Sequence, residues 1–91
     1  MSTVKITTNN RFELEVNDYV AFIEFDKIEP TILDLVHTEV PKELSGKGIG
    51  SKLVFGALQY CKVHKLKIIP SCPFIKNYID KHPEWTALFS T

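Results

Sequence analysis

The sequence has little cysteine, no net charge and no long apolar run. Its two cysteines are too few for a disulfide framework, so we expect a reduced, cytoplasmic protein with no structural zinc site. Its 11 basic and 11 acidic residues cancel, which argues against a general nucleic-acid or membrane binder. No apolar stretch approaches the roughly 18 residues of a membrane span, and Met1-Ser2-Thr3 does not open a signal peptide.

What the chain does contain is typical of one globular domain. At 91 residues, two domains would each be too small to bury a useful core, so we expect residues 1–91 to form a single domain. A hydrophobic fraction of 44% with 24% charged residues is too apolar for disorder. The zero charge hides a division, because residues 1–40 carry a net charge of −5 and residues 41–91 a net charge of +5. This asymmetry favours two surfaces for differently charged partners, although chance explains it equally well in so short a chain.

The first forty residues alternate apolar and polar side chains with period two, as half-buried strands do. Asn9-Asn10, Asn17-Asp18 and Glu29-Pro30 are turn pairs between the segments. Turns at intervals of about ten residues indicate an antiparallel meander. The predicted strands are residues 4–7, 12–16, 19–28 and 31–40.

After Pro41 the apolar period changes to that of a helix. An apolar stripe runs along this predicted helix, through Ile49, Leu53, Val54, Ala57, Leu58 and Cys61. Three further elements follow: a strand at 66–71, a helix at 73–79, and a turn at 84–89 that Trp85 and Phe89 anchor. A strand–helix–strand crossover requires a parallel pair. The predicted fold class is therefore α+β, a mostly antiparallel sheet of about five strands with helices packed on it.

Three glycines, Gly46, Gly48 and Gly50, alternate at the entrance of the long helix. They allow a close backbone approach to a ligand, and the unpaired N–H groups of the first helical turn form an anion site beside Lys47 and Lys52. The alternative is a tight loop whose glycines serve only its sharp turn. The spacing does not fit a P-loop, because a motif that starts at Gly46 needs a glycine at position 51, which is Ser51. It does not fit a dinucleotide fingerprint either, because that motif needs a glycine at position 51 when it starts at Gly46, or at position 53 when it starts at Gly48, and these positions are Ser51 and Leu53.

The loop resembles the acyl-CoA signature of the GNAT superfamily of N-acetyltransferases, over the segment from Val40-Pro41 to Leu53. In that superfamily the motif has the form Arg/Gln-x-x-Gly-x-Gly/Ala after the fourth strand, and helix-start amides bind the pyrophosphate. Gly48 and Gly50 match it, whereas Ser45 stands in the place of the Arg or Gln. The resemblance implies that acetyl-CoA contacts Val40, Ser45, Gly46, Lys47, Gly48, Ile49, Gly50 and Ser51, with Phe74 and Asn77 as further contacts on the next helix.

The rest of the chain is similar to one small branch of that superfamily, the short single-domain YjdJ-type proteins. The marks of this branch are His37-Thr38-Glu39-Val40-Pro41, Ile69-Pro70-x-Cys72-Pro73-Phe74, Tyr78-Ile79 and His82-Pro83-Glu84-Trp85. Compared with a full GNAT enzyme, the chain lacks the two helices after the first strand and the final hairpin. Those parts usually wall the acceptor site, so the resemblance implies a shallow acceptor pocket or one that a partner completes.

Cys72 follows a predicted strand and precedes a helix that begins at Pro73. A helix N-terminus stabilises a thiolate, and open α/β sheets bind ligands at the carboxyl edge of their parallel strands. The resemblance makes Cys72 the candidate catalytic or acyl-accepting residue; the alternative is a small buried hydrophobe. Cys61 lies on the apolar stripe and is predicted to belong to the core.

Three further side chains are candidates for proton transfer. His37 and Glu39 end the fourth strand, and period two places them on one face, where either could deprotonate an amine. Their alternatives are a hydrogen-bonded strand histidine and a solvated carboxylate. The resemblance gives Tyr78 as a candidate to protonate the leaving CoA thiolate, with packing as its alternative. His64 and His82 end helices without metal-ligand neighbours, so no metal site is predicted.

Together these features predict an acetyl-CoA-dependent N-acetyltransferase that acts on an amine, directly or through acetyl-Cys72. The acceptor is left open among a small amine, a polyamine and a protein lysine. The alternative from another class is a non-catalytic module that binds CoA or acetyl-CoA and acts as a sensor or partner subunit; Ser45 and the missing acceptor walls favour it. A third interpretation is a phosphate-binding protein unrelated to CoA. We expect a monomer or weak dimer without nucleic-acid or membrane partners.

Overall fold

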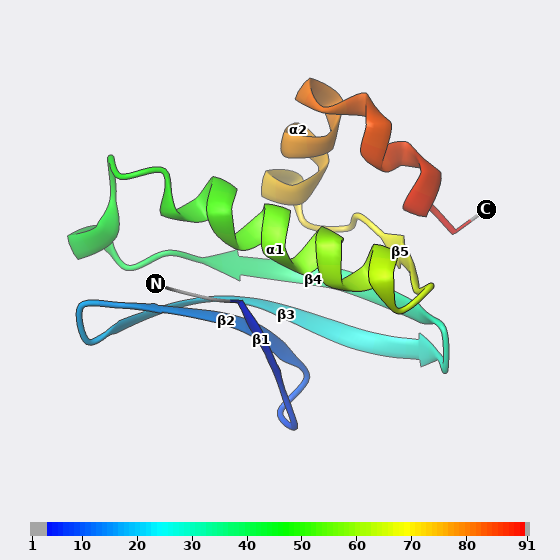
Figure 1. Cartoon of the computed structure of the whole chain (residues 1–91), viewed down its shortest axis with the longest axis horizontal. Helices are drawn as coiled ribbons and strands as arrows, with labels where there is room; N and C mark the ends of the chain where they lie inside the picture. The colour runs from blue at the N-terminus through cyan, green and yellow to red at the C-terminus, as the bar shows by residue number, and fades with distance from the viewer. Residues whose placement is uncertain (1–3, 91) are drawn as a thin grey trace.

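A five-stranded sheet forms one layer of the molecule, and the helices cover one of its faces (Figure 1). The computed structural model describes residues 4–90, so the signal-peptide prediction made for Met1-Ser2-Thr3 lies outside the described residues. The elements in chain order are β1 (Lys5–Thr7), β2 (Arg11–Val16), β3 (Tyr19–Glu29), β4 (Ile32–Glu39), the 3-10 helix η1 (Lys42–Leu44), α1 (Ile49–Val63), β5 (Lys67–Ile69), α2 (Pro73–Lys81) and the 3-10 helix η2 (Pro83–Leu88).

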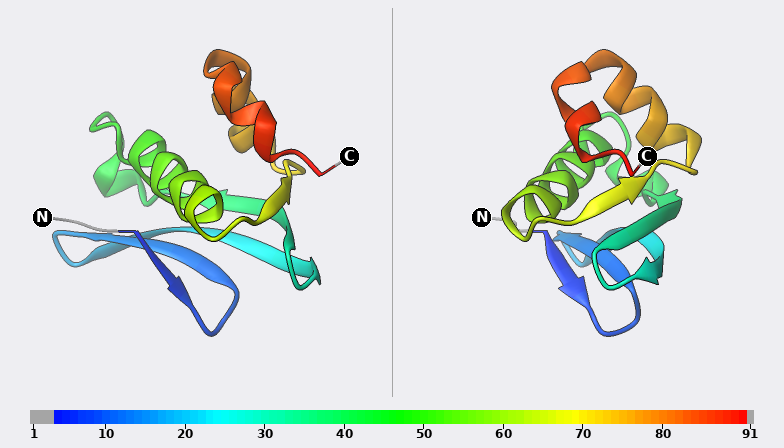
Figure 2. Two further views of the ribbon diagram at one scale, coloured as in Figure 1. Left: turned by 45° about the vertical axis from the view of Figure 1, so that its right-hand side comes forward. Right: turned by 90° about the vertical axis from the view of Figure 1, so that its right-hand side faces the viewer.

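The strands pair in sequence order, β1-β2-β3-β4-β5. The first four strands pair antiparallel with one another, whereas β4 and β5 run parallel. Figure 2 shows the crossover that joins this parallel pair through α1 from two further sides. Short polar residues that tolerate a positive φ make two of the turns, at Asn10 (61°), Asn17 (49°) and Asp18 (70°). The predicted antiparallel meander with one parallel crossover is confirmed, and with it the α+β fold class.

The alternation of apolar and polar side chains along each strand decides which face of the sheet is buried. Phe12 and Leu14 of β2 and Ala21 and Ile23 of β3 are at most 2% exposed, and they belong to the same core cluster as the apolar stripe of α1. All six residues predicted for that stripe are buried. Each large apolar side chain buried here stabilises the fold by about 1.5–3 kcal/mol, so this interface holds α1 against the sheet.

β4 and β5 pair over only part of the length of β4. The register joins Ile32, Leu33 and Asp34 to Lys67, Ile68 and Ile69. The Cys72 N–H then donates to the Leu35 carbonyl at 2.9 Å, and beyond this point β4 has no strand on that side within residues 4–90. At the same place the register against β3 shifts between Glu24 and Phe25, which leaves Val36 as the extra residue of a β-bulge. Pairing on this side of β4 therefore ends just before the bulge.

From Pro41 onward the chain follows the predicted order with two differences. α2 begins at Pro73, a first helical position that needs no N–H, and η2 buries Trp85 as predicted. The predicted strand at 66–71 is shortened to β5 before Pro70, which cannot donate to a ladder. The predicted loop at 42–45 contains η1, since the Leu44 N–H donates to the Pro41 carbonyl at 2.9 Å.

Within residues 4–90, no helix combines the length and the apolar character that a membrane crossing requires.

Candidate functional site

A cavity of about 230 Å³ lies where the end of β4, the glycine loop, the start of α1 and the start of α2 meet. It is lined by Val40, Leu44, Ser45, Gly46, Gly48, Ile49, Gly50, Ser51 and Phe74. All of these except Leu44 are predicted cofactor contacts. The structure therefore brings together, in one hollow, residues from two segments that lie more than twenty positions apart in the chain.

The backbone amides at the start of α1 border this cavity. Gly48 is the N-cap residue and has left-handed dihedrals (φ 70°, ψ 18°), and no side chain caps the helix. The Lys52 N–H donates to the Gly48 carbonyl at 3.1 Å and is the first amide bonded within the helix. The amides of Ile49, Gly50 and Ser51 precede it, so the helix itself offers them no acceptor. Free amides at the positive end of a helix dipole bind anions, which suits this end of the cavity to a phosphate-bearing ligand.

Gly50 and Phe74 join the two helices at the wall of the cavity. A Cβ on Gly50 would lie 2.6 Å from Cζ of Phe74, closer than two carbon atoms can approach. Gly50 thus allows the aromatic ring, which stays 43% exposed, to close onto the first turn of α1. With Val40 and Leu44, this ring gives the cavity an apolar part beside the amides.

Cys72 lies just after β5, where backbone pairing with β4 ends. It is the N-cap residue of α2 and only 5% exposed, which confirms its predicted place between a strand and a helix N-terminus. Its thiol donates to the Thr38 hydroxyl, with Sγ and Oγ1 3.3 Å apart. Cys61, in contrast, is fully buried in the α1 stripe as predicted, and this burial raises the pKa of its thiol to about 12.

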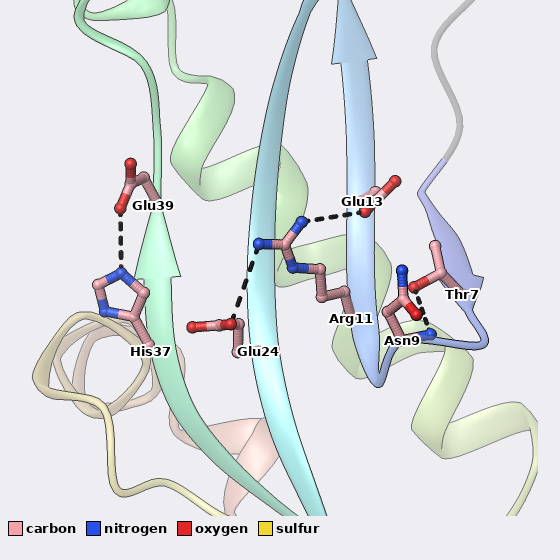
Figure 3. Close-up of polar contacts among 7 residues, drawn as sticks. All are labelled: Thr7, Asn9, Arg11, Glu13, Glu24, His37 and Glu39. Atoms are coloured by element: carbon pink, nitrogen blue, oxygen red, sulfur yellow. Dashed lines mark hydrogen bonds and ion pairs between the residues drawn. The ribbon is translucent and has the colours of Figure 1, made fainter.

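His37 and Glu39 share one face of β4, as period two predicts (Figure 3). Nε2 of His37 lies 3.1 Å from Oε1 of Glu39, and about half of each side chain is exposed. Because a carboxylate only accepts hydrogen bonds, Nε2 is the donor in this contact, and in the neutral ring Nδ1 then keeps its lone pair. Thr38, between them, points to the helix-covered face and contacts Cys72. The structure therefore places the His37–Glu39 pair and Cys72 on opposite sides of β4.

The sheet face around this pair is not covered by a helix within residues 4–90 (Figures 1 and 3). Arg11 lies between two carboxylates, 3.6 Å from Glu13 and 3.9 Å from Glu24. Its guanidinium lies 3.7 Å from the centre of the Phe22 ring, and the His37 ring lies 6.2 Å from the same ring. This face thus offers aromatic and acidic groups beside a histidine with a free ring nitrogen.

Tyr78 lies one helical turn beyond Phe74 on α2. Its ring stacks on His82 with the centres 4.2 Å apart, and it is not among the described residues that line the cavity. Burial, and then the negative charge of Glu84, raise the pKa of Tyr78 above its ordinary value. The hydroxyl therefore keeps its proton at neutral pH, as a proton donor must, although the packing against His82 also agrees with the structural alternative.

Lys47 and Asn77 are exposed and lie outside the cavity lining in the described part of the chain. Ser45 does line the cavity, but its hydroxyl donates to the Lys42 carbonyl at 2.8 Å. The side chain that departs from the superfamily motif therefore serves the loop, and its contact with a cofactor stays a prediction.

Sequence reasoning missed Thr38 and Leu44. A signal for Thr38 was present, since period two places it on the opposite face from His37 and Glu39, toward the helices. Leu44 is the apolar residue in an otherwise polar loop and is 1% exposed, which is the mark of a loop that folds back onto the core. Within residues 4–90 no three His, Cys, Asp or Glu side chains gather as a metal site, and the prediction that the protein uses no metal stays a prediction.

Comparison with known proteins finds relatives named NATD1 in several organisms. Protein NATD1 of Gallus gallus is 33% identical over 63 residues, which cover 69% of this chain and 57% of that protein. Human NATD1 (Homo sapiens) is also 33% identical over 63 residues, with 69% and 56% covered. The matched segment thus spans little more than half the length of these relatives. Assignment of the chain to the YjdJ-type branch stays a prediction.

A solved structure and a family model extend the match to nearly the whole chain. The solution structure of a GCN5-like protein from Staphylococcus aureus matches with a TM-score of 0.71 and 29% sequence identity, covering 99% of this chain and 91% of that chain. The family model described as GCN5-related N-acetyl-transferase matches residues 11–88, which include the cavity and Cys72. The chain therefore belongs to the GCN5-related N-acetyltransferase family.

Proposed function

We propose that the protein is an acetyl-CoA-dependent N-acetyltransferase that transfers an acetyl group to an amine. One observation carries the proposal: the unbonded amides at the start of α1 and the apolar walls of Val40 and Phe74 border the same cavity. Coenzyme A carries a charged pyrophosphate and a long, uncharged pantetheine arm, so its binding needs both kinds of surface. Family membership supports the acetyl transfer and the amine class of the acceptor.

In this proposal the amides of Ile49, Gly50 and Ser51 bind the pyrophosphate, with Lys47 nearby as an exposed counter-charge. The pantetheine arm follows β4 beyond Leu35, where the strand has backbone groups that β5 does not use. The thioester then reaches the end of the backbone pairing between β4 and the chain after β5, beside Cys72. An extended ligand arm can bond there as an added strand would.

In the direct route the amine reaches the thioester past the edge of β4 that no strand covers within residues 4–90, because His37 and Cys72 lie on opposite sides of that strand. An amine arrives as an ammonium ion and loses one proton to His37, whose Nδ1 has the free lone pair because Nε2 is bonded to Glu39. Its nitrogen attacks the thioester carbon, the new C–N bond forms, and the bond from that carbon to the CoA sulfur breaks. The second proton of the nitrogen goes to the CoA thiolate, for which Tyr78 is the candidate relay.

The two-step route passes through Cys72. The Cys72 sulfur attacks the thioester carbon, the bond to the CoA sulfur breaks, and the thiol proton passes to the CoA thiolate. The amine then attacks acetyl-Cys72, the C–S bond to Cys72 breaks, and the proton lost by the nitrogen returns to the cysteine. The small exposed fraction of Cys72 keeps water from such an intermediate.

Titration with acetyl-CoA followed by mass spectrometry of the intact protein tests binding and acylation together. We expect saturable binding, and transfer to at least one amine in a panel of small amines, a polyamine and a lysine peptide. The two-step route predicts an added acetyl mass that peptide mapping locates at Cys72; Cys72→Ala abolishes it and the matched control Cys61→Ala retains it. Unchanged turnover in Cys72→Ala would leave the direct route alone.

The same experiment distinguishes the rival function. Binding without turnover across the whole amine panel would identify a non-catalytic CoA-binding module. Failure to bind either acetyl-CoA or CoA would overturn both proposals.

A further inference from the structure

We propose that Thr38 is a positioning residue for Cys72, whose hydroxyl accepts a hydrogen bond from the thiol and donates one to the thiolate. The catalytic meaning of this contact rests on the proposed function, in its route through Cys72. The contact itself is a property of the chain alone and can be tested without any cofactor.

The backbone of Cys72 is held on two sides. Its N–H donates to the Leu35 carbonyl of β4 at 2.9 Å, and its carbonyl accepts the Lys76 N–H of α2 at 3.0 Å. These bonds leave only rotation about the Cα–Cβ bond to decide where the sulfur points. A single side-chain contact is therefore enough to fix the position of the sulfur.

The thiol does not take the usual task of an N-cap side chain. A serine or aspartate at this position would accept an amide of the first helical turn, but no side chain caps α2. The thiol instead donates to Thr38 across the gap between α2 and β4, with Sγ and Oγ1 3.3 Å apart. Sulfur is a weak acceptor and is a poor cap for the amides of α2. The Cys72 thiol is therefore free to contact Thr38 of β4.

Thr38 is suited to hold a sulfur in either protonation state. A hydroxyl has two acceptor lone pairs and one rotatable proton, so it accepts from the neutral thiol and turns to donate once the thiol proton has left. Its β-branched side chain restricts rotation about χ1, and the bulge at Val36 precedes it on the same strand. Removal of the hydroxyl would leave the thiolate without this donor.

In the first step of the two-step route, the Thr38 hydroxyl changes from hydrogen-bond acceptor to donor as the Cys72 thiol reacts. The thiol proton leaves Cys72, its sulfur bonds to the acetyl carbon, the carbon–sulfur bond to CoA breaks, and the CoA thiolate takes up the proton. Thr38 gains no bond to the substrate in this step. It orients the nucleophile and lowers the cost of its negative charge.

The test compares Thr38→Val, which keeps the shape and loses the hydroxyl, with Thr38→Ser, which keeps the hydroxyl. The rate of Cys72 alkylation by iodoacetamide is measured against pH and located by peptide mapping. The ultraviolet absorbance of the thiolate is titrated in parallel, as the difference from the same protein carrying Cys72→Ala. Cys61 does not interfere, because burial raises the pKa of its thiol to about 12.

Thr38→Val is expected to lower the alkylation rate at neutral pH about threefold to tenfold, the effect of one lost hydrogen bond, and to move the pH profile upward. Thr38→Ser should stay within about twofold of the unmodified chain, and so should Thr31→Val, a control on an exposed turn. An unchanged rate and profile in Thr38→Val, or equal losses in Thr38→Val and Thr38→Ser, would overturn the inference. If Thr38→Val is unfolded at the assay temperature, Thr38→Ala provides the same comparison.

No acetyl-CoA is present in these measurements, so the two proposals fail separately. If Thr38→Val leaves the alkylation of Cys72 unchanged, this inference is wrong, and the acetyl transfer is still judged by turnover. Absence of acetyl transfer removes the proposed function and leaves the effect of Thr38 on the thiol unchanged.

Discussion

The two cysteine side chains lie in opposite surroundings within a chain of 91 residues. Cys61 is fully buried among apolar side chains of α1, where a negative charge has no partner. Cys72 has a hydroxyl beside it and lies at a helix N-terminus. Only the second environment offers stabilisation to a thiolate, so the two thiols should differ in reactivity even though both are almost inaccessible.

The raised pKa of Cys61 should make the fold less stable at high pH. Between the ordinary thiol pKa of 9.0 and the value of about 12 in the folded protein, the unfolded chain binds fewer protons than the folded one. The free energy of unfolding therefore falls as the pH rises through this window, by up to about 1.4 kcal/mol per pH unit from this group. Below the unfolded pKa the contribution is fully present and the slope vanishes.

Denaturant unfolding of the unmodified chain and of Cys61→Ala, measured across this pH range, checks the effect. Cys61→Ala should be less stable at neutral pH because it leaves a cavity, yet its stability should fall less steeply above pH 9. Cys72→Ala is the control and should keep the steep slope. Parallel slopes in the Cys61→Ala variant and the unmodified chain would show that Cys61 is not the source.

Gly50→Ala should change the cavity more than the fold. The added methyl group would meet the far end of the half-exposed Phe74 ring, which can swing away, while alanine is about 1 kcal/mol better than glycine inside a helix. We expect a stability within about 1 kcal/mol of the unmodified chain and an acetyl-CoA affinity about tenfold weaker, since the ring no longer closes the cavity.

A double-mutant cycle with Phe74→Leu checks this interpretation by isothermal titration with acetyl-CoA. The smaller side chain leaves room for the methyl group, so the two substitutions should be coupled by about 1 kcal/mol. Strictly additive losses would mean that Gly50 acts through its backbone amide rather than through the ring.

At the residue scale, the sequence predicts which residues belong to the site and which face of a strand they occupy. It predicts less well which side chains contact each other. The motif around Gly46, Gly48 and Gly50 is local, and residues that are near in sequence line one cavity. The partner of Cys72 is Thr38, thirty-four positions away, and its choice depends on how far β5 extends along β4. Such a contact follows from the register between strands, which single-strand periodicity does not encode.

At the element scale, apolar periodicity predicts most of the architecture. It places the strands that become β2 and β3 and the stripe of α1 close to their observed bounds. The bulge at Val36 and the turn η1 were not predicted, because both arise from backbone pairing and not from the pattern of side chains. Of these two irregular features, η1 contributes Leu44 to the cavity lining, and the bulge lies next to the place where pairing on the β5 side of β4 ends.

The start of α1 depends on the left-handed conformation of Gly48. An added Cβ there would meet no atom within 4 Å, so the cost of a substitution is conformational and not steric against neighbours. Gly48→Ala should therefore lower the free energy of unfolding by about 1–2 kcal/mol. Gly48→Asn should lower it less, because asparagine tolerates φ near the observed 70°.

Thermal denaturation of Gly48→Ala, Gly48→Asn and Gly56→Ala ranks the positions. Gly56 is the contrasting case, a helical glycine whose added Cβ would meet the Val4 side chain at 2.3 Å or more. If Gly48→Ala and Gly48→Asn lose equal stability, the left-handed geometry is not what α1 requires.

At the scale of the whole molecule, the charge division of the sequence largely follows the two layers, and β5 is the basic segment that lies in the sheet. The residues that carry the net charge of −5 form the four antiparallel strands, and those that carry +5 form the glycine loop, the helices and β5. Under the proposed function the anionic cofactor meets the basic layer and a cationic amine meets the acidic sheet. From the sequence alone, chance explained the charge asymmetry equally well. In the fold, the two oppositely charged halves lie in different parts of the molecule.

This arrangement predicts that acetyl-CoA binding weakens with salt through the lysines near the loop. Raising the ionic strength from about 0.1 M to about 1 M shortens the Debye length from about 10 Å to about 3 Å, so long-range attraction of the cofactor is lost. Lys47→Gln should weaken binding about threefold to tenfold at the lower salt concentration and reduce the salt dependence. The measurement is a titration of each variant at the two salt concentrations.

Lys62→Gln is the matched control for net charge, because Lys62 lies in the last turn of α1. The 15 residues of that helix separate its ends by about 20 Å, twice the Debye length at about 0.1 M. Screening should therefore hide Lys62 from a pyrophosphate at the glycine loop but leave Lys47 effective. Equal losses from Lys47→Gln and Lys62→Gln would show that the basic layer attracts the cofactor as a whole, and that the loop is not the place where its phosphates bind.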